Sequence, residues 1–165
     1  MCIRDSTYGG GAALLSSSFV SGFMWLDKLG IAAYHHKKVF RQDFVGRNYC
    51  LLDENAYPLP DYWLSALYKR LVGIQVLNVK GALESGRQVR VYAHCAKSPY
   101  PKGSVVLIIL NTIDNETVVT LTDDELINSD QDIYWLTPSP VTNICLLYTS
   151  PSPRDRTRSR MPSSA

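Results

Sequence analysis

The hydrophobic pattern changes its period near Gly73, and this change constrains the fold more than any other feature of the chain. Before Gly73, apolar residues in the stretches Leu14–Leu29 and Tyr62–Val72 recur at steps of three and four residues, which predicts two amphipathic helices. Between them, Val39–Phe44 is short and bounded by two lysines and a glycine, which predicts a strand. The first part of the chain is therefore expected to run loop, helix, strand, loop, helix.

Residues at the helix ends support this assignment. Asp61 stands where an N-cap is expected, and Gly30 and Gly73 follow the two apolar patterns as helix stops. Aromatic residues at helical spacing are expected in the core: Trp25, Trp63 and Tyr68.

After Gly73 the chain contains short segments rich in Val, Ile, Tyr and Thr, separated by Gly, Pro, Asn and Asp. These runs predict strands at 74–79, 88–95, 104–111, 117–121 and 133–136. Short strands at regular spacing with turn signals between them are typical of an antiparallel sandwich. A domain boundary is therefore expected near Gly73.

The two ends of the chain are related at the level of nucleotides. One choice of codons for Met1–Ser6 has a reverse complement that encodes Cys145–Thr149, and an inverted repeat of this kind has no reason at the protein level. The same string resembles a transposon end used to tag sequencing libraries, and the tail after Cys145 resembles adapter read-through. We therefore expect 1–6 and 145–165 to be artefacts, and we exclude them from fold reasoning.

This exclusion changes the charge balance. The tail after Cys145 carries four arginines against one aspartate, so it holds the excess positive charge of a chain whose net charge is +2, and residues 7–144 are close to neutral. A nucleic-acid partner is therefore not expected. Cys50 and Cys95 remain, which is too few for a disulfide framework. No apolar stretch is long enough to predict a transmembrane segment.

Three quoted segments carry a resemblance to a known family: YGGGAALLSSSFVSGFMWLDKLG, NYCLLDENAYPLPDYWLSALYKRLVG and VRVYAHC. In this order they resemble the C-terminal part of the heparanase family, retaining endo-β-glucuronidases that cut heparan sulfate. The resemblance implies an α/β plus β fold, in which 7–73 is the last part of a (β/α)8 barrel and 74–144 is part of a β-sandwich.

The resemblance also implies that the reacting carboxylates lie outside this chain. A retaining glycosidase needs two of them, a nucleophile and a general acid. The family's nucleophile glutamate would fall at Ile3, inside the expected adapter, and the acid lies further upstream. Asp43, Asp53 and Glu54 do not match either position. We therefore expect an enzyme family but an inactive chain.

The resemblance also implies that several residues of this chain bind substrate. The family pattern is matched at six positions: Tyr8, Gly9, Gly10, Gln42, Asn48 and Tyr49. Glycine suits a loop whose amides contact a uronate carboxylate, because no Cβ blocks the anion. A tyrosine offers a sugar an apolar face and a hydroxyl. By contrast, the basic run His35–Lys38 is expected to be a solvated loop, and its two histidines lack a third metal ligand.

Two further residues acquire expectations. Asn115 begins an N-glycosylation triplet in a predicted turn. The resemblance implies that Cys95 pairs with a cysteine beyond this chain.

The expected substrate and partner is heparan sulfate or a related uronide polysaccharide, with no cofactor and no metal. The missing N-terminal part of the barrel and sandwich is the other partner. The expected location is secreted, in the extracellular matrix, or lysosomal.

Two alternatives stay open. The protein could be a β-glucuronidase acting on another uronide glycan, because this segment does not read sulfation. It could also be a non-catalytic heparan-sulfate-binding relative that has lost a carboxylate. The upstream sequence separates these readings, because an enzyme requires both glutamates.

Overall fold

The fold was analysed in a computed structural model of the chain. It describes residues 2–4, 15–41, 43–46, 49–80, 88–113, 115–123, 126–127, 129–138 and 145–150. The predicted binding residues Tyr8, Gly9, Gly10, Gln42 and Asn48 lie outside these ranges.

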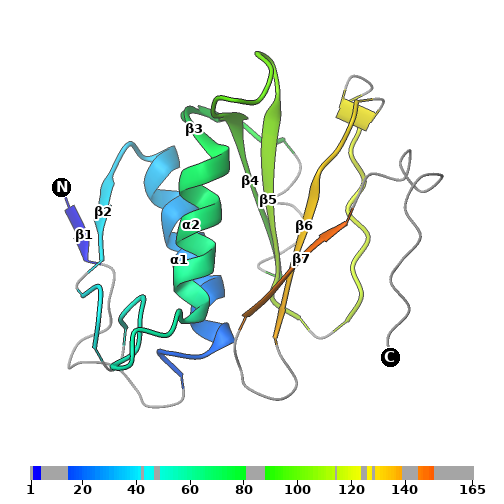
Figure 1. Ribbon diagram of the computed structural model, residues 1–165. Coiled ribbons are helices and arrows are strands. Elements are labelled where there is room, and N and C mark those ends of the chain that lie inside the picture. Colours follow the sequence, from blue (N-terminus) through cyan, green and yellow to red (C-terminus); the bar gives the residue numbers. More distant parts are fainter. Residues whose placement is uncertain are drawn as a thin grey trace.

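The first part is an α/β arrangement (Figure 1). Strand β1 (Cys2–Arg4) is followed by helix α1 (Phe19–Tyr34) and strand β2 (Lys38–Phe40). β1 and β2 pair in parallel, with Ile3 opposite Val39. Helix α2 (Pro60–Leu71) lies beside α1, and both helices begin at the end of the molecule where β1 and β2 finish. Residues that follow β2 therefore lie at the same end as the helix N-termini.

The second part is antiparallel. Strands β3 (Val72–Leu77), β4 (Val89–Ala96) and β5 (Val105–Asn111) form a sheet in that order. Strands β6 (Ile133–Pro138) and β7 (Cys145–Ser150) form a separate antiparallel pair. The α/β part and the antiparallel sheet that follows it confirm the predicted change from helical to strand-rich sequence. The barrel and the sandwich themselves remain predictions.

The two helices pack against strand β4 through specific contacts. The Asp27 carboxylate of α1 accepts hydrogen bonds from Arg90 Nη1, at 3.0 Å to each oxygen, and from the Tyr92 hydroxyl. On α2, the ring of Tyr68 meets the ring of His94 edge to face, with centroids 5.9 Å apart. Buried apolar residues complete the core: Trp25, Ala32, Tyr49, Cys50, Leu64, Val89, Ala93 and Leu110.

The glycines have other roles than the predicted helix stops. α1 continues through Gly30 to Tyr34, so the predicted stop is wrong. Gly30 is needed for packing, because a Cβ there would lie 2.5 Å from carbons of the Tyr92 ring. Gly73 lies inside β3, where a Cβ would lie 2.6 Å from the Cys95 carbonyl oxygen. The helix α2 already ends at Leu71.

Four further expectations are corrected. The N-cap of α2 is Leu59 with Pro60 following it, and Asp61 is a buried residue of the first turn. Trp63 is exposed, whereas Trp25 is buried as predicted. Residues 117–121 form no strand, and only Lys38–Phe40 of the region around 39–44 is a strand. Pairing explains the two strand corrections, because a β-prone run becomes a strand only beside a partner strand.

Candidate functional site

The loop that follows β2 carries the one predicted sugar-binding residue that the structure describes, Tyr49. The Phe44 carbonyl accepts hydrogen bonds from the amides of Leu51 and Leu52, at 3.1 and 2.9 Å, which folds the loop back on itself. Leu59 then donates its amide to the Leu51 carbonyl at 2.9 Å. These bonds fix both sides of the segment that holds Tyr49.

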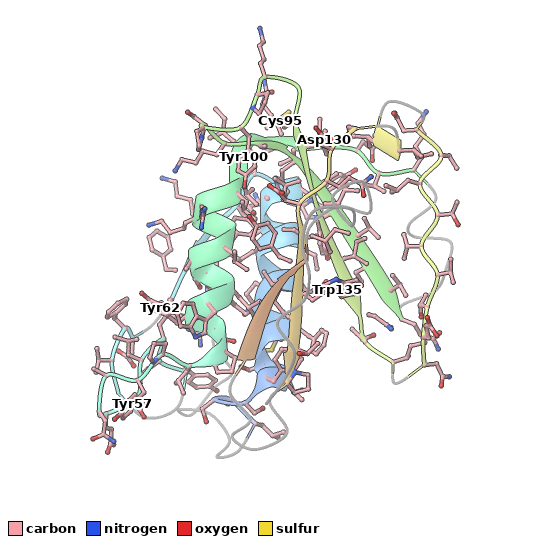
Figure 2. All side chains as sticks on the ribbon, turned by 45° about the vertical axis from the view of Figure 1, so that its right-hand side comes forward. Tyr57, Tyr62, Cys95, Tyr100, Asp130 and Trp135 are labelled. Atoms are coloured by element: carbon pink, nitrogen blue, oxygen red, sulfur yellow. The ribbon has the colours of Figure 1, made fainter. Side chains whose placement is uncertain are left out.

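The next turn of this loop is built around Asp53. Its Oδ1 accepts the backbone amides of Asn55 and Tyr57, each at 2.8 Å. An aspartate that bonds to the backbone beyond it is a common turn former. Figure 2 shows Tyr57 and Tyr62 at the end of the molecule where the helices begin. The carboxylate of Asp53 therefore shapes the loop.

Tyr49 itself is buried and adopts an unusual backbone conformation. Only 5% of its surface is exposed, and its φ is +68°. A non-glycine residue with positive φ is uncommon and persists where surrounding contacts hold it. Its carbonyl oxygen accepts a hydrogen bond from Arg41 Nε at 2.7 Å. With so little exposed area, Tyr49 does not present an open ring face to solvent.

Arg41 is held in turn by a buried ion pair. Its Nη2 lies 2.7 Å from Oδ2 of Asp61, which is 2% exposed. Oδ1 of Asp61 accepts the Ser21 hydroxyl at 3.0 Å, so both oxygens of this carboxylate have a donor. The guanidinium carbon lies 4.7 Å from the centre of the Trp25 ring, within cation–π range. The Asp61–Arg41 pair thus joins α1, α2 and the loop.

Trp25 of α1 is oriented by a hydrogen bond to α2. Its Nε1 donates to the Ser65 hydroxyl at 2.8 Å, and Ser65 donates to the Asp61 carbonyl at 2.6 Å. We call Ser21, Trp25, Arg41, Asp61 and Ser65 the Arg41 cluster. Its polar groups satisfy one another, as buried polar groups must.

Cys50 follows Tyr49 directly and is also buried. Burial raises the pKa of its thiol, the negative charge of Asp43 raises it further, and Arg41 opposes both. A thiol with a raised pKa is a weak nucleophile at neutral pH. Cys50 is therefore a packing residue of the loop.

The structure also places Ile3, Asn115 and Cys95. Ile3 lies on β1 beside Val39 of β2, an apolar residue at the position where the family resemblance expects a carboxylate. Asn115 is exposed, and its carbonyl accepts a hydrogen bond from Asn111 Nδ2 at 3.0 Å. Cys95 lies at the end of the molecule opposite Tyr57 (Figure 2) and forms no disulfide with any cysteine whose side chain is described.

Sequence reasoning missed Arg41, Asp61 and His94. Asp61 was interpreted as a cap because it precedes an apolar helix, and Arg41 was one residue of a predicted strand. His94 is 1% exposed, and neither ring nitrogen has a hydrogen-bond partner among the residues that the structure describes. Burial lowers the pKa of His94, because it disfavours the charged form. The available signal for His94 was a polar residue inside the apolar run VYAHC, whereas Arg41 is followed by the polar residues Gln42 and Asp43 and gives no such signal.

The described residues contain neither a metal-binding cluster nor a helix that could span a membrane. No three His, Cys, Asp or Glu side chains in the described ranges lie close enough to hold a metal ion together. In the same ranges, neither helix combines the length and apolar character that crossing a bilayer requires.

Comparison with known proteins identifies relatives of this chain. No protein-family profile matches it. Heparanases from four vertebrates are 45–53% identical to it. For heparanase of Mus musculus, the identity is 48% over 142 residues, covering 82% of this chain and 26% of the relative.

Two other relatives differ in their stated activity. Inactive heparanase-2 of Homo sapiens is 42% identical over 120 residues, covering 64% of this chain and 20% of the relative. Hyaluronoglucuronidase of Hirudo nipponia is 39% identical over 143 residues, covering 81% of this chain and 29% of the relative. The chain therefore spans about a quarter of the length of the relatives that it matches.

Proposed function

Because the chain is homologous to the heparanases, a family of glycoside hydrolases, over about four fifths of its residues, we propose that it is a segment of an endo-β-glucuronidase. The intact protein would hydrolyse heparan sulfate with retention of configuration. The single observation that carries this proposal is the identity of 45–53% to vertebrate heparanases.

In this proposal the segment contributes sugar binding and not the reacting carboxylates. Retaining hydrolysis requires a nucleophile and an acid about 5–5.5 Å apart. The succession of α1, β2 and α2 supports the assignment of 7–73 to a (β/α)8 barrel, whose catalytic groups lie at the carboxyl ends of the strands. The nucleophile would then stand at the position of Ile3. The antiparallel strands after Gly73 would be part of a sandwich.

The proposed sugar subsite lies at the same end. Tyr8, Gly9, Gly10, Gln42 and Asn48 would contact the uronide together with Tyr49. The loop after β2 supports this, because it follows the carboxyl end of a strand. The proposed location is secreted or lysosomal, and Cys95 would pair with a cysteine outside this chain.

The experiment is recovery of the full-length coding sequence followed by an assay of the intact protein on heparan sulfate. Glutamates at both barrel positions and appearance of new reducing ends would support the proposal. Intact heparan sulfate after incubation with a folded protein would contradict it.

A non-catalytic binder is the second candidate, favoured by the identity of 42% to inactive heparanase-2. It predicts that one of the two glutamates is replaced while affinity for heparan sulfate remains. Hyaluronan should be tested in parallel, because a hyaluronoglucuronidase is also among the relatives. Cleavage of hyaluronan but not of heparan sulfate would shift the substrate class.

A further inference from the structure

The backbone at Tyr49 needs external support. Its φ of +68° lies in the left-handed region, and Tyr49 has neither the freedom of glycine nor the short polar side chain that tolerates this conformation. The conformation therefore persists because contacts around it hold it. The amides of Leu51 and Leu52 donate to the Phe44 carbonyl and so close the loop around Tyr49, but these bonds involve no atom of Tyr49 itself.

Arg41 supplies a contact to the Tyr49 peptide itself. The bond from Arg41 Nε to the Tyr49 carbonyl is 2.7 Å long and comes from a charged donor. Such bonds are shorter and stronger than those between neutral groups. The guanidinium is planar, so fixing one of its nitrogens on Asp61 also fixes the direction in which Nε points.

Asp61 can serve as the fixed point because it is anchored on two helices. Its backbone belongs to the first turn of α2, and its second carboxylate oxygen accepts the Ser21 hydroxyl of α1. Its burial keeps water from competing for the ion pair. The two helices thus set the position of one loop peptide through a single guanidinium.

We propose that Arg41 and Asp61 are positioning residues of the sugar subsite: their ion pair holds the Tyr49 peptide where the uronide binds. This inference rests on the proposed function. It goes beyond it by assigning to two groups that touch no substrate a role in substrate affinity.

The chain contains a matched control. Asp27 and Arg90 also form an ion pair between side chains from different elements, at 3.0 Å. That pair joins α1 to β4, and none of its hydrogen bonds involves Tyr49. Arg41→Lys and Asp61→Asn can therefore be compared with Arg90→Lys and Asp27→Asn in the intact parent protein.

Three measurements are made on all four variants: KM and kcat on heparan sulfate, the Kd for heparan sulfate chains, and hydrogen exchange of the Leu51 and Leu52 amides. We expect Arg41→Lys and Asp61→Asn to raise KM and Kd on the order of 10–100-fold, with kcat changed less, because a misplaced binding group is costly. Exchange at Leu51 and Leu52 should accelerate. The control variants should lower Tm while leaving KM, Kd and exchange at Leu51 and Leu52 unchanged.

Equal KM and Kd values in the test and control variants would overturn the inference, even in an active enzyme. Unchanged exchange at Leu51 and Leu52 would overturn it as well. A folded parent protein that neither cleaves nor binds heparan sulfate would instead reject the proposed function. Hydrogen exchange at Leu51 and Leu52 would still decide whether the Arg41–Asp61 ion pair holds the loop around Tyr49.

Discussion

Gly30 of α1 lies so close to Tyr92 of β4 that a Cβ on Gly30 would come within 2.5 Å of the ring. The ring cannot easily move aside, because its hydroxyl is bonded to Asp27 on the same helix. The helix therefore contacts the antiparallel sheet through a glycine, although glycine is a poor helix former. Packing outweighs helix propensity at this position.

Gly30→Ala should destabilise the intact protein by about 1–3 kcal/mol through overpacking, although alanine favours a helix. Thermal unfolding measures the loss. The double variant Gly30→Ala with Tyr92→Leu should recover part of it, because the smaller side chain makes room. A single Gly30→Ala variant as stable as the wild type would contradict the close contact.

Stability should fall on acidification because of His94. Burial lowers its pKa in the folded state, so the unfolded chain binds the proton more tightly. The contribution is present above the unfolded pKa of about 6.5 and is lost as the pH falls through the lower folded pKa. Unfolding by urea at a series of pH values measures it.

His94→Leu should remove this part of the pH dependence, since leucine does not titrate. His35→Leu is the control, because His35 is exposed at the end of α1. An unchanged slope of stability against pH in His94→Leu would show that other groups cause it.

Asp27→Asn should lower the pKa of Tyr92, which is raised to about 12 by burial and by its contact with Asp27. Burial is the larger cause, so the pKa should stay above the ordinary value of about 10. In the wild type, the stabilising effect of this raised pKa is present below pH 10 and is lost as the pH rises through 12. NMR titration of labelled tyrosine measures the shift. A Tyr92 pKa unaffected by Asp27→Asn would argue against the hydrogen bond.

Asn115 should carry a glycan when the intact protein passes through the secretory pathway, because it begins a triplet of the acceptor type and is exposed. Asn115→Gln and Thr117→Ala should each remove the same mass, as read by mass spectrometry before and after glycosidase treatment. Glu116→Gln is the matched control, since it leaves the triplet intact. An unmodified wild-type peptide from secreted protein would reject the site.

The 165-residue chain expressed alone should aggregate or stay partly molten. Large apolar side chains are open to solvent, among them Phe40, Phe44, Ile74, Val118 and Trp135, and Ile74 is 99% exposed. Apolar surface of this kind normally contacts another part of the same protein or a partner. Size-exclusion chromatography with light scattering tests this, and a monomer that melts cooperatively would contradict it.

The elements with strong local signals were predictable, and their ends were less so. The periodic runs predicted both helices, because burying one helix face requires that period, and runs rich in Val, Ile, Tyr and Thr predicted the three strands of the antiparallel sheet. The run at 117–121 has the composition of a strand but pairs with no strand in the described ranges. Composition alone therefore does not show whether an edge is available for pairing.

The candidate site divides in the same way. The position of Tyr49 in a loop after a strand followed from the sequence, but its positive φ and its bond to Arg41 did not. The sequence predicts Asp61 as a helix cap, and only the structure shows that it is the buried partner of Arg41.

The amino-acid sequence by itself determined the order of helices and strands, the change of texture near Gly73 and the family resemblance, because each depends on residues that are neighbours in the chain. Only the tertiary structure decided that Asp61 pairs with Arg41, that Gly30 contacts Tyr92 and that His94 is buried with no hydrogen-bond partner in the described part of the chain. These contacts join residues 20 or more positions apart in the chain. Their energies come from burial and charge pairing, which arise only when separate elements pack together.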